Sequence, residues 1–256
     1  SQSTVFFSAT LLPMDYFMNL LTGAANHLNR IFQSPFPQEN VCLLIHNKIS
    51  TKFAQRADSY NAIAETIETV LGTHVGNYLV YFPSYVYLNE VVERLKERLP
   101  ERQLLIQERG MTEESRDAFL SRFSSTNEET LVGLAVMGGI FGEGIDLVGE
   151  RLIGVVVIGV GIPQLGLERD LIKEYFDRDM GSGFAYAYQY PGFNRVLQAT
   201  GRVIRTDTDQ GIIVLIDDRF THTHYRHLFP SHWRGYQVVK NTSEMKDKLT
   251  RFWSRK

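Results

Sequence analysis

The chain has 256 residues, of which 43% are hydrophobic and 22% charged, and its formal net charge is −2. Such a composition is typical of a globular protein with one large domain or two small ones. The near-neutral charge gives no compositional sign of nucleic-acid binding, so such a function would depend on local placement of charge. The single cysteine, Cys42, excludes an internal disulfide and a multi-cysteine metal or iron–sulfur site within the chain.

Neither a secretion signal nor a membrane span is predicted. Residues 1–25 lack a basic start followed by an apolar run. The longest apolar stretch, residues 152–162, is about half the length of a membrane span and contains glycines. We therefore expect a cytoplasmic protein without membrane contact. The chain opens directly on a strand-like run, which suggests a cut through a larger protein.

The first elements are a strand and a helix. Residues 4–9, TVFFSA, are β-branched or aromatic and predict a buried strand, and a helical pattern follows to about Leu21. After an irregular stretch, residues 41–46 predict a second strand. Apolar residues at helical spacing then predict a helix over 58–72, where Gly72 supplies a stop.

Short apolar strands and helices alternate along the rest of the chain. Further strands are expected at 78–82, 103–107, 131–136, 152–159 and 211–217. Helices are expected at 84–98, at 112–123 with Thr112 as the N-cap, and at 198–205. Buried strands that alternate with helices predict an α/β fold, with a mostly parallel sheet covered by helices on both faces.

The loops expected at the carboxyl ends of these strands are rich in glycine and polar residues. Ligands of parallel sheets bind at that edge. The run MGGIFGEGIDLVGE at 137–150 places Glu143 and Asp146 among five glycines. Glycines allow backbone N–H groups to approach an anion or a nucleic-acid backbone closely. The chain contains neither G-x-G-x-x-G nor G-x-x-x-x-G-K-S/T, so it lacks the usual loop that cradles nucleotide phosphates.

The segment QATGRVIR at 198–205 carries an amide and two guanidiniums at spacings of four and three. On a helix, Gln198, Arg202 and Arg205 would lie within about 60° of one another. Their side chains would face one external object, and guanidinium suits phosphate or carboxylate. A solvated helix with surface arginines is the alternative for these eight residues taken alone.

Three other clusters favour structural interpretations or leave the choice open. The histidines of HTHYRH at 222–227 have spacings that give no single ligand face, so solvated histidines are favoured over a metal site. Asp217 and Asp218 are adjacent at a strand end, where hydrogen bonding is favoured over a nuclease-type metal pair. The aromatic residues of 184–193 could stack on bases or belong to the core.

Four stretches in order together resemble motifs III to VI of superfamily 2 helicases, and most closely the DinG branch of the XPD/Rad3 group. They are FFSATLLP at 6–13, GNYLVYFPSY at 76–85, GGIFGEGIDLVGERLIGVVVIGVGIPQ at 138–164 and QATGRVIRTDTDQGIIVLIDDRF at 198–220. The four stretches touch about a quarter of the residues. The resemblance implies a RecA-like domain of an ATP-dependent DNA helicase that acts on single-stranded DNA with 5′→3′ polarity.

The resemblance also implies roles for individual residues. Arg202 and Arg205 would reach the γ-phosphate of ATP, one of them as an arginine finger, and Gln198 would orient them. Gly144 and Asp146 would lie near the nucleotide at the domain interface. The remaining residues would act on the DNA side of the domain. Gly139, Ser84 and Tyr85 would contact the DNA strand, and Ser8 and Thr10 would relay between ATP and DNA.

By the same resemblance, residues 1–25 would be the tail of a first motor domain and residues 26–256 the second. ATP and Mg²⁺ would be held mainly by the first domain of the same polypeptide, with no metal site in this chain. The chain alone would not hydrolyse ATP. The alternatives are a non-catalytic α/β module that binds nucleic acid or protein, and a metal nuclease built on Asp146, Asp217 or Asp218.

Overall fold

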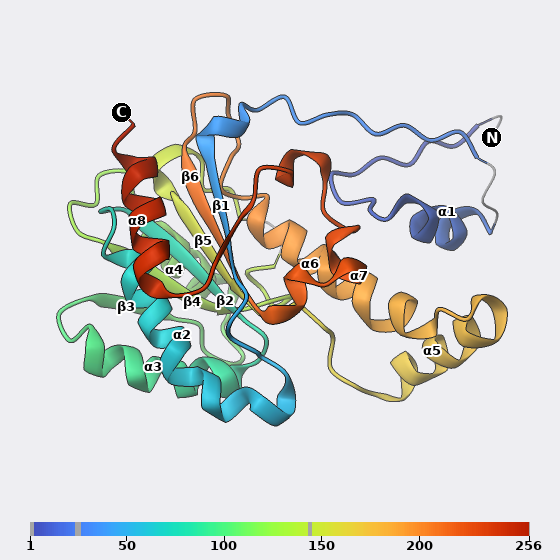
Figure 1. The fold of residues 1–256 in the computed structure, drawn as a ribbon, viewed down its shortest axis with the longest axis horizontal. Coiled ribbons are helices and arrows are strands. Elements are labelled where there is room, and N and C mark those ends of the chain that lie inside the picture. Colours follow the sequence, from blue (N-terminus) through green and yellow to red (C-terminus); the bar gives the residue numbers. More distant parts are fainter. Residues whose placement is uncertain (1–2, 24–26, 143–144, 256) are drawn as a thin grey trace.

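A seven-stranded sheet forms the centre of the computed structural model, which describes residues 3–23, 27–142 and 145–255. Its strand order is β3-β4-β2-β5-β6-β1-β7, and neighbouring strands pair in parallel (Figure 1). The strands are β1 (Val41–His46), β2 (Asn77–Phe82), β3 (Gln103–Ile106), β4 (Leu131–Val136), β5 (Gly154–Ile158), β6 (Gly211–Ile216) and β7 (Gln237–Val239). The predicted α/β class and parallel sheet are confirmed.

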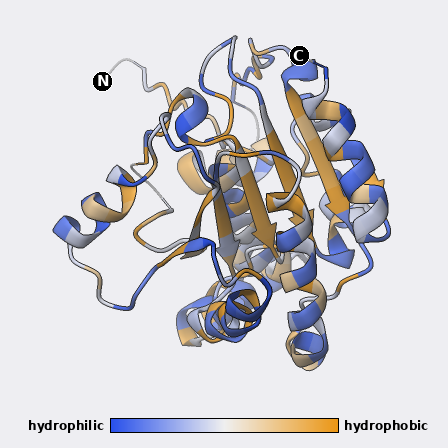
Figure 2. Cartoon of the chain, turned by 90° about the vertical axis from the view of Figure 1, so that its left-hand side faces the viewer, coloured by the Kyte–Doolittle hydropathy of each residue, from blue (hydrophilic) through white to orange (hydrophobic). Residues whose placement is uncertain are grey.

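Helices cover both faces of this sheet. The described helices are α1 (Met14–Thr22), α2 (Arg56–Leu71), α3 (Tyr85–Arg98), α4 (Glu113–Ser121), α5 (Leu167–Met180), α6 (Tyr190–Thr200), α7 (Thr223–Arg226) and α8 (Thr242–Trp253), of which α1 and α5 lie beside the sheet (Figure 1). One core cluster joins the sheet to α2, α3 and α8, and a second joins it to α4, α6 and α7. Figure 2 shows the hydrophobic strands lying between helices whose surfaces carry many hydrophilic residues.

Successive side chains along a strand enter the two core clusters in turn. On β2, Val80 packs into the cluster with α2 and α3, whereas Leu79 and Tyr81 pack into the cluster with α6. Successive side chains of a strand point to opposite faces, so a strand buried on both faces is apolar throughout. This is why short continuous apolar runs identified the strands correctly.

The first predicted strand, at 4–9, is wrong. Residues 3–10 form no helix or strand, and the side chains of Val5 and Phe7 are 80% and 91% exposed. A strand needs a neighbour to satisfy its backbone groups, and the described sheet offers this run no partner. The helix after it is confirmed as α1, whose Tyr16 ring packs edge-on against Tyr186 with centroids 5.1 Å apart.

Several elements were not predicted. α5 contributes no buried residue: Leu167, Leu171 and Tyr175 recur at helical spacing, but their side chains are exposed. α7, β7 and α8 also went unrecognised, as did the π-helical turn Ala185–Gln189 that leads into α6. None of the described helices is long and apolar enough to cross a membrane.

Gly161 allows the loop after β5 to touch the first turn of α6. Its φ is +72°, and a Cβ added there would lie 2.2 Å from the Gly192 carbonyl oxygen. We expect Gly161→Ala to lower the free energy of unfolding by about 1–3 kcal/mol or more, because backbone must move to admit the methyl group. Urea unfolding would measure this. Gly166→Ala is the matched control, since an added Cβ there meets nothing within 4 Å, and equal losses in the two variants would contradict the explanation.

Candidate functional site

The two candidate arginines lie beyond the helix that was expected to carry them. α6 ends at Thr200, and Gly201 closes its last turn with a backbone hydrogen bond. Arg202 and Arg205 lie in the turn and loop that follow. The predicted helical face of Gln198, Arg202 and Arg205 is therefore wrong, because glycine is a poor helix former and the helix stops at it.

The two guanidiniums nevertheless converge on one place, the glycine-rich loop after β4. Arg202 donates from Nη1 to the Ile145 carbonyl oxygen at 3.2 Å and from Nη2 to the Gly142 carbonyl oxygen. Arg205 donates from Nη2 to the same Ile145 oxygen at 3.1 Å. Arg202 is 6% exposed, whereas Arg205 is exposed. Tertiary contacts thus achieve the grouping that was expected from helical spacing.

Asp209 fixes the backbone that carries Arg205. Its carboxylate accepts hydrogen bonds from the N–H of Arg205 at 2.7 Å and from the N–H and hydroxyl of Thr206 at 2.8 and 2.6 Å. Burial alone would raise the pKa of Asp209, but these bonds and one from the N–H of Gly149 outweigh burial and lower that pKa. This role could not be predicted from the sequence, because an aspartate in TDTD is typical of an ordinary turn.

The other residues expected near the nucleotide are distributed around this loop. Gln198 lies in the last turn of α6 and is partly exposed. Asp146 is exposed and directly follows Ile145, the residue whose carbonyl holds both arginines. Gly144 lies outside the described residues.

Two of the three expected DNA-contacting residues are brought together by Gln107. Its Nε2 donates to the Tyr85 hydroxyl at 2.7 Å, and its Oε1 accepts from the Val136 N–H at 2.7 Å. A Cβ added at Gly139 would lie 3.2 Å from the same Nε2. The Arg109 guanidinium lies over the Tyr85 ring, 5.0 Å from its centroid.

Sheet order explains this meeting. β2, β4 and β3 are neighbours, so the loops at their carboxyl ends share one edge. Ser84 also belongs to this edge, where its hydroxyl accepts from the Tyr87 N–H at 3.3 Å and caps α3. Sequence reasoning missed Gln107 and Arg109 because the partners that reveal them are distant in the chain.

A family match covers most of the chain. Residues 67–236, more than half of the chain, match the family model described as "Helicase C-terminal domain". The chain belongs to this family. The helicase domain is 28% identical over 216 residues to a probable ATP-dependent helicase of Methanocaldococcus jannaschii, and 27% identical over 197 residues to the ATP-dependent DNA helicase DinG of Photobacterium profundum. The resemblance to DinG and XPD/Rad3 helicases is confirmed.

These relatives are much longer than the helicase domain. The alignments cover 78% and 75% of this chain but 32% and 27% of the two relatives. A solved structure of XPD in its apo form superposes with a TM-score of 0.69 at 21% identity, covering 91% of this chain and 47% of that one. This likeness supports the RecA-like fold.

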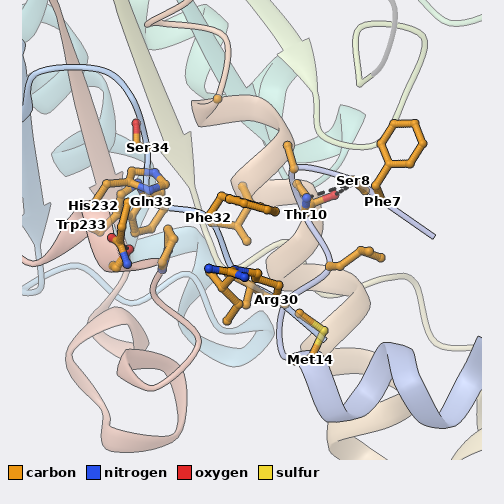
Figure 3. Close-up of a pocket in the computed structure, with 18 of the residues that line it drawn as sticks. Phe7, Ser8, Thr10, Met14, Arg30, Phe32, Gln33, Ser34, His232 and Trp233 are labelled. Atoms are coloured by element: carbon orange, nitrogen blue, oxygen red, sulfur yellow. Dashed lines mark hydrogen bonds between the residues drawn. The ribbon is translucent and has the colours of Figure 1, made fainter. Parts of the chain in front are cut away.

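A cavity of about 1490 Å³ lies between the amino-terminal segment and the body of the helicase domain. Figure 3 shows Ser8 and Thr10 beside one another at this cavity, with their hydroxyl oxygens 3.4 Å apart. Leu197 and Ile204, from either side of the α6 end, line it as well. Ser8 is exposed and Thr10 is partly exposed. The side-chain hydrogen bonds described for these two residues join them to each other and not to Tyr85.

The alternative clusters have structural roles. Asp217 is fully buried and accepts hydrogen bonds from Thr51 and Arg219, which confirms hydrogen bonding as its role. Among the described residues, no group of three histidine, cysteine or carboxylate side chains could hold a metal ion. Tyr186, Tyr188 and Phe193 are buried, so most of the aromatic residues of 184–193 belong to the core.

Proposed function

We propose that residues 26–256 are the second of two RecA-like motor domains in an ATP-dependent DNA helicase, and that residues 1–25 are the tail of the first. Membership of the helicase C-terminal domain family supports this role. The names of the relatives, ATP-dependent helicases, support the activity of the whole protein. A cytoplasmic location belongs to the same proposal.

Arg202 and Arg205 would complete an ATP site from outside. ATP and Mg²⁺ would be held mainly by the first motor domain, and Mg²⁺ would neutralise charge on the phosphates. The guanidiniums would stabilise the negative charge that develops on the transferring phosphoryl group. Gln198, Gly144 and Asp146 would border the nucleotide. Hydrolysis would then require the two domains to close.

Ser84, Tyr85 and Gly139 would contact single-stranded DNA, and Ser8 and Thr10 would relay between the domains. Translocation would run 5′→3′. Backbone N–H groups at a glycine-rich loop and a tyrosine ring are suited to a phosphate backbone and a base.

One observation carries the proposal. Arg202 and Arg205 both donate to carbonyl oxygens of the loop that begins at Met137 and includes Gly139. A phosphate that moves the arginines would therefore also move this loop, which we propose to contact single-stranded DNA. This gives a physical route from nucleotide to DNA within one segment.

ATP hydrolysis by the full-length protein and by the 256-residue chain alone tests whether the ATP site needs both motor domains. The full-length protein that carries this chain should hydrolyse ATP, and the 256-residue chain alone should show no turnover above background, because it lacks a phosphate-cradling loop. Release of phosphate measures both. Turnover by the isolated chain would contradict the proposal, and absence of turnover in the full-length protein would indicate a module without motor activity.

A further inference from the structure

Arg195 occupies the space beside a glycine of the same strand-end loop. This residue lies in α6, and a Cβ added at Gly138 would lie 2.9 Å from its Nε and 3.1 Å from its Cζ. Gly138 has a φ of +74°, a conformation that favours glycine. The missing side chain at this position lets an arginine from α6 lay its guanidinium across the turn after β4.

A second arginine adds to the same positive field. Burial lowers the pKa of Arg195, and the nearby charge of Arg169 lowers it further. Arg169 belongs to α5, and its Nη1 donates to the Ala187 carbonyl oxygen at 3.3 Å. Both arginines are partly buried, and arginine stays charged at such positions.

Within the described part of the chain, neither guanidinium has an acidic partner within ion-pair distance. Other arginines of the chain do: Arg94 pairs with Glu90, Arg98 with Glu68 and Arg219 with Asp217. Partly buried like charges without a counter-charge are unfavourable. Binding of an anion would relieve that repulsion.

The pair continues a row of contacts across the sheet edge. Gly138 adjoins Gly139, which contacts Gln107, which bonds to Tyr85. Arg109 covers the Tyr85 ring at the far end of this row. The row thus has arginines at both ends, with glycines, an amide and an aromatic ring between them, which suits an extended polyanion with bases better than a compact anion.

We propose that Arg169 and Arg195 form a phosphate-binding pair that holds the backbone of single-stranded DNA as it leaves the Gly138–Gly139 turn. This inference rests on the proposed function, because it extends the DNA interface of the same sheet edge. The pair lies on α5 and α6, outside the strand-end loops that carry the other expected contacts. It also gives α5, which buries none of its residues, a role in binding.

Salt-dependent binding of a fluorescent oligothymidine to the 256-residue chain tests the pair. The variant R169Q/R195Q should bind at least about tenfold more weakly at low salt, as expected for the loss of a charge-assisted contact. The slope of log K against log salt should become shallower by about 1.4, since each phosphate neutralised on a single strand contributes about 0.7. R251Q, on α8 and on the other face of the sheet, is the matched control and should bind like the wild type.

Thermal unfolding separates a binding defect from a folding defect. The double variant loses the Arg169 hydrogen bond to Ala187 but also removes two partly buried charges, so its unfolding midpoint at low salt should stay close to that of the wild type. A clearly lower midpoint would assign the pair a structural role and overturn the inference.

The remaining outcomes separate this inference from the proposed function. If the wild type binds the oligonucleotide and the double variant binds equally well with the same slope, the inference is overturned and the proposed function stands. If the wild type does not bind at all, both are overturned. Displacement of the oligonucleotide by inorganic phosphate more effectively than by chloride at equal ionic strength would identify a small-anion site and also overturn the inference.

Discussion

Arg205→Ala in the full-length protein should lower kcat for ATP hydrolysis by about a thousandfold or more. An arginine finger acts on charge that develops in the transition state, and its loss has an effect on that scale. The KM for ATP should change little, because the interaction removed is absent from the ground state. Steady-state phosphate release at saturating single-stranded DNA would measure both constants.

Arg205→Ala should leave the surrounding loop in place. The backbone of Arg205 is held by Asp209, and the only side-chain hydrogen bond described for Arg205 is to the Ile145 carbonyl. Truncation therefore leaves the loop anchored. Arg205→Lys should recover little activity, because an ammonium lacks the planar fork that meets two phosphate oxygens. Arg251→Ala should leave kcat unchanged, and a similar kcat for Arg205→Ala would contradict the assignment.

Asp217→Ala should lower the free energy of unfolding by about 3–5 kcal/mol, the range for breaking a buried ion pair. Asp217 is fully buried, and Arg219 donates to it from Nε at 2.7 Å and from Nη2 at 2.9 Å. Thr51 donates from its N–H at 3.2 Å. Burial alone would lower the pKa of Arg219, but the bond to Asp217 and its charge raise it, so removal of Asp217 leaves a partly buried cation unpaired.

Lys52→Ala is the matched control for Asp217→Ala. Lys52 forms an ion pair with Asp218 at 2.9 Å, but its side chain is 46% exposed, so its loss should change stability by about 0–1 kcal/mol. Urea unfolding of both variants would give the comparison. Equal stability of Asp217→Ala and the wild type would show that the buried pair contributes nothing to the fold.

The fold was largely predictable because β1, β2, β4, β5 and β6 are mainly apolar runs buried on both faces. Caps could also be identified, as Thr112 shows by accepting from the Ser115 N–H at 3.2 Å. α5 was not predicted, although Leu167, Leu171 and Tyr175 recur at helical spacing, and the fold leaves these side chains exposed. The run at 4–9 failed because its composition favours a strand but the described sheet gives it no neighbour.

The candidate site was predictable by residue type and not by geometry. Arg202 and Arg205 do converge, but through contacts with Gly142 and Ile145, about 60 residues earlier in the chain. Helical spacing alone placed them on a helix that ends at Thr200. Long-range partnerships of this kind have no signature in a single sequence.

Gln107, Asp209 and Arg195 were missed for the same reason. Gln107 joins the ends of β2 and β4, Asp209 anchors the Arg205 backbone, and Arg195 fills the space beside Gly138. Each residue type is ordinary at a surface loop or helix. Only the partners that the fold brings to them show what they position.

We propose that this chain couples a DNA strand to ATP hydrolysis through the loop after β4. The most direct test is ATP turnover by the full-length protein with and without single-stranded DNA. DNA should raise the turnover rate, and this stimulation should disappear in Arg205→Ala. Turnover that is the same with and without DNA and indifferent to Arg205 would contradict it.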